Sequence, residues 1–81
     1  MEIEELNKKT NEIHNIISAN VIKYRKMRNC SQLQLALDIG FTGNAFIARA
    51  EKRVNNAHFN IEQIVKISSI LDVGIENFFI K

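Results

Sequence analysis

Apolar residues in this chain recur at steps of three and four, which is the spacing of one face of an α-helix. The longest series consists of Ile3, Leu6, Ile13, Ile17, Tyr24 and Met27, with Thr10 and Asn20 filling the remaining steps. Few stretches alternate apolar and polar residues as a half-buried strand does. Proline, which interrupts helices, is absent from all 81 residues. The sequence therefore predicts an all-α fold.

The longest apolar series fits two arrangements. It predicts either one helix over residues 2–28, or a short leading helix followed by a second one from about residue 14. A helix of about a dozen residues is marginal in water by itself. We therefore assign residues 1–13 to an N-terminal helical extension that needs a partner surface, and residues 14–81 to a single domain.

Three polar residues that favour helix N-caps predict where the next three helices begin: Ser31, Thr42 and Asn60. Gly40 ends the first of these helices, because glycine adopts the left-handed conformation without a steric penalty. The other two are expected to end near Arg53 and Leu71, and Gln63 completes a variant capping box with Asn60. A last helical turn at 75–79 brings the prediction to five helices.

Length and cysteine content limit the class of function. A chain of 81 residues forms one domain with a modest core, which suits a binding module better than an enzyme cleft. Cys30 is the only cysteine, which fits a reducing compartment. The charged start, MEIEELNKKT, lacks the apolar core of a signal peptide, and no apolar run approaches the roughly 20 residues of a membrane helix. We therefore expect a cytoplasmic protein.

No constellation for catalysis or metal binding stands out. His14, Cys30 and His58 lack the close spacing of a zinc site, which needs about four ligands. Gly40 and Gly43 are not followed by the Lys-Ser/Thr pair of a phosphate-binding loop. We therefore expect no enzyme activity, no metal and no cofactor.

The net charge of +2 is unevenly distributed along the chain. Residues 1–12 carry four acids and two lysines, residues 13–56 carry seven bases and two acids, and residues 57–81 carry two bases and three acids. A basic middle between acidic flanks indicates an anionic partner that faces the middle. Chance clustering on a solvated surface explains the same charges equally well.

The segment CSQLQLALDIG and the residues after it have the pattern of two short helices joined by a tight turn. Ala36 is small enough for the helices to cross closely, and Gly40 makes the turn. An apolar residue near the middle of the second helix, either Phe46 or Ile47, locks the crossing. Leu33, Leu35 and the other leucine of this segment are interpreted as core.

These residues resemble the Cro/phage-repressor type helix-turn-helix family, also called the XRE family of bacterial regulators. The resemblance covers about residues 18–80 and rests on Val21 to Arg25, Ser31-Gln32, Leu35-Ala36, Gly40-Phe41-Thr42, Ile47, Glu51, Asn60, Ile64, Ile67, Leu71-Asp72-Val73 and Phe78-Phe79. It implies a compact five-helix lambda-repressor-like fold that binds double-stranded DNA sequence-specifically. Such a protein is a small transcriptional regulator, in most cases a repressor, that acts as a dimer.

Two departures from the family pattern lie around Glu51. This glutamate stands one residue further along than in the family, so one residue is inserted in FTGNA. With the insertion, Ile47 is the buried lock and Glu51 pairs with Arg25, as the family's arginine and glutamate do. Without it, Phe46 is the lock and Arg49 points inward unpaired, which is costly, so we prefer the insertion. The KRVNN loop that follows also lacks the glycine many relatives carry.

The resemblance implies that the helix over about 43–53 enters the major groove. Asn44 is the best candidate to read adenine, and Arg49 reads guanine or holds phosphate, although a turn asparagine and a solvated charge are the plainer interpretations. Lys23, Lys26 and Arg28 are interpreted as solvated. The full set expected to contact DNA is Ser31, Gln32, Thr42, Gly43, Asn44, Ala45, Ala48, Arg49, Lys52, Arg53 and Asn55.

The expected partners are double-stranded DNA and a second copy of the chain. The seam between two copies is expected either at the apolar C-terminus, 78–80, or along Ile3 to Ile13. An alternative function is a protein-interaction module of the same fold, such as an antitoxin that neutralises a toxin. A third interpretation is a helical protein that self-associates through residues 1–28 and has no affinity for DNA.

Overall fold

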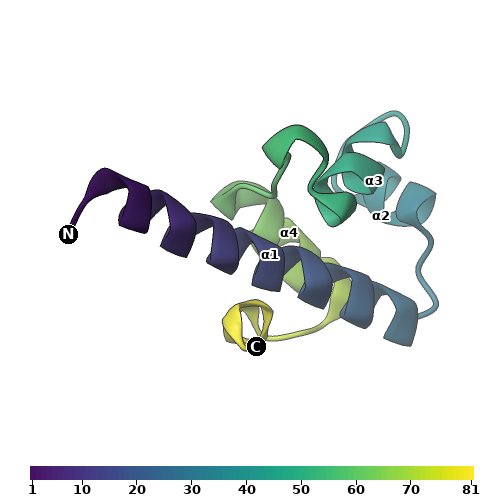
Figure 1. The fold of residues 1–81 in the computed structure, drawn as a ribbon. Helices are drawn as coiled ribbons and strands as arrows, with labels where there is room; N and C mark the ends of the chain where they lie inside the picture. The colour runs from purple at the N-terminus through teal and green to yellow at the C-terminus, as the bar shows by residue number, and fades with distance from the viewer.

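The computed structural model describes all 81 residues, and its regular elements are all helical (Figure 1). The four α-helices are α1 (Ile3–Met27), α2 (Gln32–Asp38), α3 (Ala45–Lys52) and α4 (Ile61–Leu71). Two short 3-10 helices follow α3 and α4: η1 (Val54–Asn56) and η2 (Ile75–Phe79). The all-α prediction is therefore confirmed. The fifth predicted helix is a 3-10 helix, because after Gly74 only five residues coil before the chain becomes extended at Ile80.

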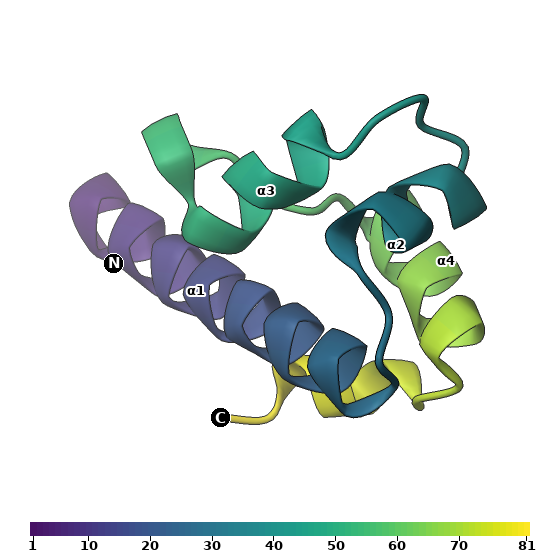
Figure 2. The same ribbon diagram turned by 90° about the vertical axis from the view of Figure 1, so that its right-hand side faces the viewer.

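The first apolar series forms one continuous helix of 25 residues, so the split arrangement is wrong. Figures 1 and 2 show that the second half of α1 lies against the other elements, while the first half extends past them. This projection gives the molecule a longest dimension of 40 Å against 24 and 19 Å in the other two directions. Every residue from 1 to 13 is exposed.

The core lies between the second half of α1 and the remaining elements. Twelve apolar residues are buried in it: Ile17, Val21, Leu35, Ala36, Ile39, Ile47, Ala50, Phe59, Ile64, Ile67, Leu71 and Phe78. Phe78 closes the core at the C-terminal end, where its ring meets Tyr24 edge to face at 5.5 Å between centroids. The core thus unites residues from both ends of the chain.

The leucines of α2 do not all join this core, which corrects the sequence interpretation. Leu35 and Ala36 are buried completely, but Leu33 and Leu37 keep 48% and 49% of their surface exposed. Leu33 and Leu37 stand four residues apart and therefore share a face of the helix, which points away from the core. A helix of seven residues has only one face against its neighbours, so half of its apolar residues remain at the surface.

Local hydrogen bonds explain where the short helices begin and end. The Ser31 hydroxyl accepts the amide of Gln34, and Asn60 forms the predicted capping box with Gln63. Gly40, with φ +102°, ends α2 in a Schellman turn, in which its own amide and that of Phe41 bond back to carbonyls of the helix.

Thr42 is not the N-cap of α3. That position belongs to Asn44, two residues later, whose carbonyl accepts the amide of Ala48. Residues 41–44 form the connection instead, and α3 is a regular helix from Ala45.

Three polar side chains, two on α1 and one at its C-cap, hold the other elements in place. The Ser18 hydroxyl donates to the Ala50 carbonyl in α3 at 2.8 Å. Asn20 donates from Nδ2 to two carbonyls of the C-terminal segment. Arg28, interpreted from sequence as solvated, donates to the Leu71 and Asp72 carbonyls at the end of α4. These bonds join residues that are distant in sequence, and nothing in the local pattern signalled them.

Candidate nucleic-acid interface

Helices α2 and α3 pack against each other, and each contributes buried residues to the contact. Ala36 and Ile47 are both fully buried where the two helices cross. Phe46 is half-buried and lies between Phe41 and Phe59, with ring centroids at 5.2 and 5.9 Å. Ile47 is therefore the buried residue that locks the two helices, as predicted, and Arg49 lies at the surface.

Helix α3 divides cleanly into a buried and an exposed face. Ile47, Ala50 and Glu51 are buried against the rest of the protein. The exposed face carries Asn44, Ala45, Arg49 and Lys52, with the half-buried Ala48 between them. In Figure 2, α3 lies above α1, on the opposite side of α1 from the C-terminal segment. The face left open is short, polar and without bulky side chains at its N-terminal end.

A buried ion pair anchors the C-terminal end of α3 to α1. Arg25 donates from Nε to Glu51 Oε2 at 2.7 Å and from Nη2 to Oε1 at 2.9 Å. The two side chains keep only 10% and 3% of their surface exposed. The third nitrogen of the guanidinium donates to the Cys30 carbonyl. This two-point geometry fixes α3 against α1 in one orientation and confirms the predicted pairing.

The ion pair continues into a chain of amides at the surface. Gln32 donates from Nε2 to Glu51 Oε1 at 2.9 Å, and Asn44 donates from Nδ2 to Gln32 Oε1 at 3.4 Å, a long hydrogen bond. The first residue of α2 is therefore held beside the N-cap of α3. Gln32 was predicted to contact phosphate, but its amide is engaged largely in these internal hydrogen bonds. The same bonds orient the Asn44 side chain.

Two cations on the open face of α3 have no partner in the protein. Arg49 and Lys52 are exposed and take part in neither of the two ion pairs nor in any side-chain hydrogen bond. They stand three residues apart and therefore share one side of the helix. An anion approaching α3 meets both charges without displacing an existing interaction.

Arg53 has a different environment from the one expected. It ends α3 in the left-handed conformation with φ +58° and is half-buried. Its guanidinium donates to Asn15 and Asn11 of α1 and to the carbonyls of Asn56 and Ala57. Arg53 therefore attaches the loop after α3 to α1, and most of its donors are satisfied internally.

The remaining predicted contacts surround the two ends of α3. Ser31 lies exposed at the start of α2, and Thr42 and Gly43 lie exposed in the turn. Asn55 lies exposed in η1, beyond the other end, with φ +52°. The structure thus brings Gln32 and Asn44 into contact and distributes the rest along one helix and its flanking loops.

The two histidines, which are distant in sequence, stack on each other. The rings of His14 on α1 and His58 before α4 lie 4.0 Å apart between centroids, inclined by 23°. His14 Nδ1 is buried without a hydrogen-bond partner, while His58 Nδ1 lies 2.9 Å from the Asn56 carbonyl. Burial, together with the nearby His58 and Arg53, lowers the pKa of His14 below its usual 6.5. No pattern in the sequence signalled this contact.

Cys30 and the acidic residues form no metal site. No group of three or more histidine, cysteine, aspartate or glutamate side chains is arranged to hold a metal ion. Burial raises the pKa of the Cys30 thiol, and the nearby Asp38 adds to this effect. The thiol is therefore protonated near neutral pH and is a poor nucleophile.

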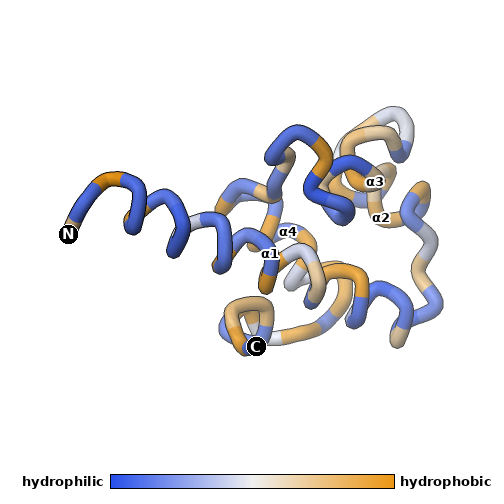
Figure 3. Tube along the Cα trace, in the orientation of Figure 1, coloured by the Kyte–Doolittle hydropathy of each residue, from blue (hydrophilic) through white to orange (hydrophobic).

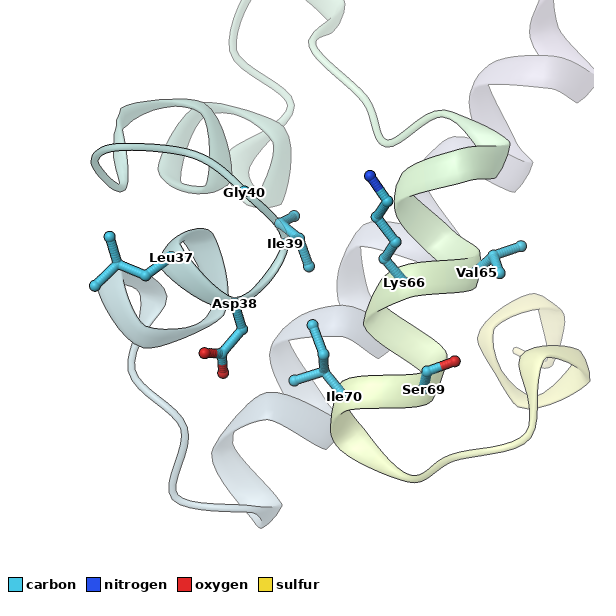
Figure 4. Close-up of a pocket in the computed structure, with 8 residues that line it drawn as sticks. All are labelled: Leu37, Asp38, Ile39, Gly40, Val65, Lys66, Ser69 and Ile70. Atoms are coloured by element: carbon cyan, nitrogen blue, oxygen red, sulfur yellow. The ribbon is translucent and has the colours of Figure 1, made fainter.

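An apolar groove of about 480 Å³ lies between α2 and α4 (Figure 4). Leu37, Ile39, Val65 and Ile70 supply its apolar lining, and Asp38 and Lys66 stand at its rim. No residue of α3 contributes to the groove. It is a second exposed feature, separate from the open face of α3.

No model of a known protein family matches the chain, and no curated protein or solved structure does either. None of the four α-helices combines the length and the apolar character that crossing a membrane requires.

Proposed function

We propose that this protein binds double-stranded DNA through α3, as a small transcriptional regulator of the Cro/phage-repressor type. The observation that carries the proposal is the open face of α3, where Arg49 and Lys52 are unpaired cations beside small residues. A helix with such a face fits the major groove of B-DNA, which is wide enough to admit one helix. The buried Arg25–Glu51 pair holds that helix rigidly enough to present it in a single orientation.

Base reading falls to the N-terminal end of α3. Asn44 pairs with an adenine edge through its amide, and the hydrogen bond that Asn44 Nδ2 donates to Gln32 Oε1 limits the rotation of that side chain. Ala45 and Ala48 keep the helix surface low, so that the backbone approaches the base pairs and a methyl group meets thymine. Arg49, one turn further, donates to guanine or to a phosphate.

Phosphate contacts come from the two ends of α3. Lys52 and Asn55 lie exposed at its C-terminal end, and Ser31, Thr42 and Gly43 lie exposed at its N-terminal end. Contacts of this kind supply affinity and salt dependence but no sequence discrimination. We further propose that the protein acts as a repressor and binds as a symmetric dimer to two half-sites about 10 base pairs apart.

The experiment is fluorescence anisotropy with a pool of random duplexes over a salt series. Arg49→Ala should weaken binding. If Arg49 neutralises one phosphate, the fall of log affinity with log salt should also become less steep, by about one unit of slope. Lys26→Ala is the matched control, because Lys26 is, like Arg49, an exposed cation without an ion pair, but it lies on α1. Equal losses in the two variants would contradict a specific role for α3.

Selection of duplexes from the same pool then gives the operator. A folded wild-type protein that binds no duplex at about 50 mM salt would overturn the proposal, since non-specific binding is strong at low salt.

The groove between α2 and α4 favours a second candidate, a protein-interaction module such as an antitoxin. Its lining residues Leu37 and Val65 are exposed by about half, and Ile61, one helical turn before Val65 on α4, is more exposed still. Exposed apolar clusters mark surfaces that bind other proteins. Under this candidate, Val65→Lys should abolish capture of a specific partner while Arg49→Ala leaves it intact.

A further inference from the structure

The first half of α1 carries an apolar stripe that nothing in the molecule covers. Ile3, Leu6 and Ile13 keep 71%, 47% and 42% of their surface exposed. A helix of this length without tertiary contacts is marginal in water, and exposed aliphatic side chains stabilise it no further. Figure 3 shows the projecting half of α1 as mainly hydrophilic, interrupted by short hydrophobic steps. The stripe is therefore narrow and flanked by solvated residues.

The same stripe is covered in the second half of the helix. Ile17 continues it and is buried, Asn20 donates to the Phe78 and Ile80 carbonyls, and Tyr24 packs against the Phe78 ring. The C-terminal segment that supplies this cover lies beneath the middle of α1 (Figure 1). One continuous stripe is thus an internal interface along its second half and is uncovered along its first half.

The spacing of the stripe specifies a helix as its missing cover. Ile3, Leu6, Thr10, Ile13 and Ile17 alternate steps of three and four, which are the a and d positions of a coiled coil. Thr10 is the one polar member, and its hydroxyl donates to the Leu6 carbonyl at 2.9 Å. Burial of Thr10 in a seam therefore leaves no unsatisfied hydroxyl.

We propose that two copies of this chain associate through the projecting halves of their α1 helices, packed antiparallel. The stripe is its own complement in this arrangement, with Ile3 facing Ile13 of the partner subunit and Leu6 facing Thr10 of the partner subunit. Asn11 and Asn15, which Arg53 binds, are not part of the stripe, so the loop after α3 does not obstruct it.

The C-terminal segment selects the antiparallel direction. A parallel partner would continue alongside Ile17 and Tyr24, where Phe78 already lies. In an antiparallel pair centred between Leu6 and Thr10, the partner's helix begins close to Ile13. It therefore does not reach the C-terminal segment that covers the second half of α1. The two domains then extend from opposite ends of a short helix pair.

Sedimentation velocity of the full chain without DNA tests the association, so its failure is distinguishable from failure of DNA binding. The seam is shorter than a standard interface, and dimer should replace monomer gradually between about 10 µM and about 1 mM. Leu6→Glu should leave a monomer throughout this range. Val65→Glu is the matched control, because Val65 is 48% exposed against 47% for Leu6 but lies in the groove between α2 and α4.

Three outcomes of this experiment would overturn the proposal: a wild-type monomer at about 1 mM, a dimer that persists in Leu6→Glu, or a dimer that Val65→Glu abolishes. The last result would place the contact in the groove. Because Leu6 makes no core contact, circular dichroism should show an unchanged fold in Leu6→Glu, and thermal unfolding at low concentration checks that its effect is on association.

Cysteine cross-linking tests the direction in a Cys30→Ser background. Ile3→Cys protein and isotope-labelled Ile13→Cys protein are mixed and oxidised, so that the mixed disulfide and the two homodimeric disulfides differ in mass and are distinguished by mass spectrometry. An antiparallel pair gives mainly the mixed disulfide, because each introduced cysteine faces the other position. Predominance of the two homodimeric disulfides would overturn the antiparallel arrangement.

Discussion

Single residues in this protein derive their importance from where the fold buries them. Arg25 and Glu51 form a two-point pair in an almost closed environment, and Gln32 adds a third bond to the same carboxylate. Such a pair is worth little compared with an apolar substitute, but removal of one partner leaves an uncompensated buried charge.

Glu51→Gln should therefore lower the free energy of unfolding by about 3–5 kcal/mol, because the Arg25 guanidinium stays buried without its anion. Urea unfolding followed by circular dichroism measures the loss. Glu62→Gln is the control, since Glu62 pairs with Lys66 at the surface and should change stability by less than about 1 kcal/mol. Similar values for the two variants would contradict the buried role of Glu51.

His14, which stacks on His58, makes stability dependent on pH. Burial, His58 and Arg53 lower the pKa of His14 below 6.5. Below that pH, His14 is therefore protonated to a greater extent in the unfolded chain than in the folded chain. The stability contributed by neutral His14 is present above about pH 6.5 and decreases as the pH falls toward the native pKa, where the dependence levels off.

His14→Gln should flatten the curve of unfolding free energy against pH between about 7 and 5, as measured by urea unfolding at each pH. An unchanged slope in this variant would show that another group titrates in this range.

At the scale of elements, backbone geometry decides where helices stop. Gly40 ends α2 at φ +102°, and a methyl group added there would meet no atom within 4 Å. Gly43 lies three residues later in the same turn, has equal space and does not have a positive φ. Alanine substitution at the two positions therefore distinguishes the cost of backbone strain at positive φ from the cost of steric crowding.

Gly40→Ala should lower the free energy of unfolding by about 1–2 kcal/mol, which is the cost of a left-handed residue with a Cβ atom. Gly43→Ala should be close to neutral. Thermal unfolding of the two variants under identical conditions provides the comparison, and equal effects would mean that the turn relaxes on substitution.

At the scale of the whole molecule, the projecting half of α1 contributes little to the stability of one copy. Residues 1–13 are all exposed, and the first tertiary ties of α1 involve Asn11 and Asn15. Deletion of residues 1–9 should therefore change the free energy of unfolding of the monomer by less than about 1 kcal/mol. Urea unfolding at low protein concentration measures it. A larger loss would indicate that this segment packs on the domain.

The local features of the fold were predictable from the sequence because they depend on residues within four positions of each other. The caps at Ser31 and Asn60 and the end of α2 at Gly40 depend on hydrogen bonds and backbone angles within one helical turn. The helical character of α1 follows from apolar residues spaced three and four apart. Even the Ile47 register followed from spacing, since the alternative placed Arg49 in the core. The Thr42 prediction was wrong because the connection continues to Asn44, and the length of a connection depends on how the two helices pack rather than on the capping preference of one residue.

Only the tertiary structure decided the contacts between distant residues. It turned Leu33 and Leu37 outward, directed Arg53 onto α1, and stacked His14 on His58. Sequence spacing encodes which residues share a helix face, but not which neighbour covers that face. That choice depends on the path of the whole chain, in which a short C-terminal segment covers one half of α1 and leaves the other half open.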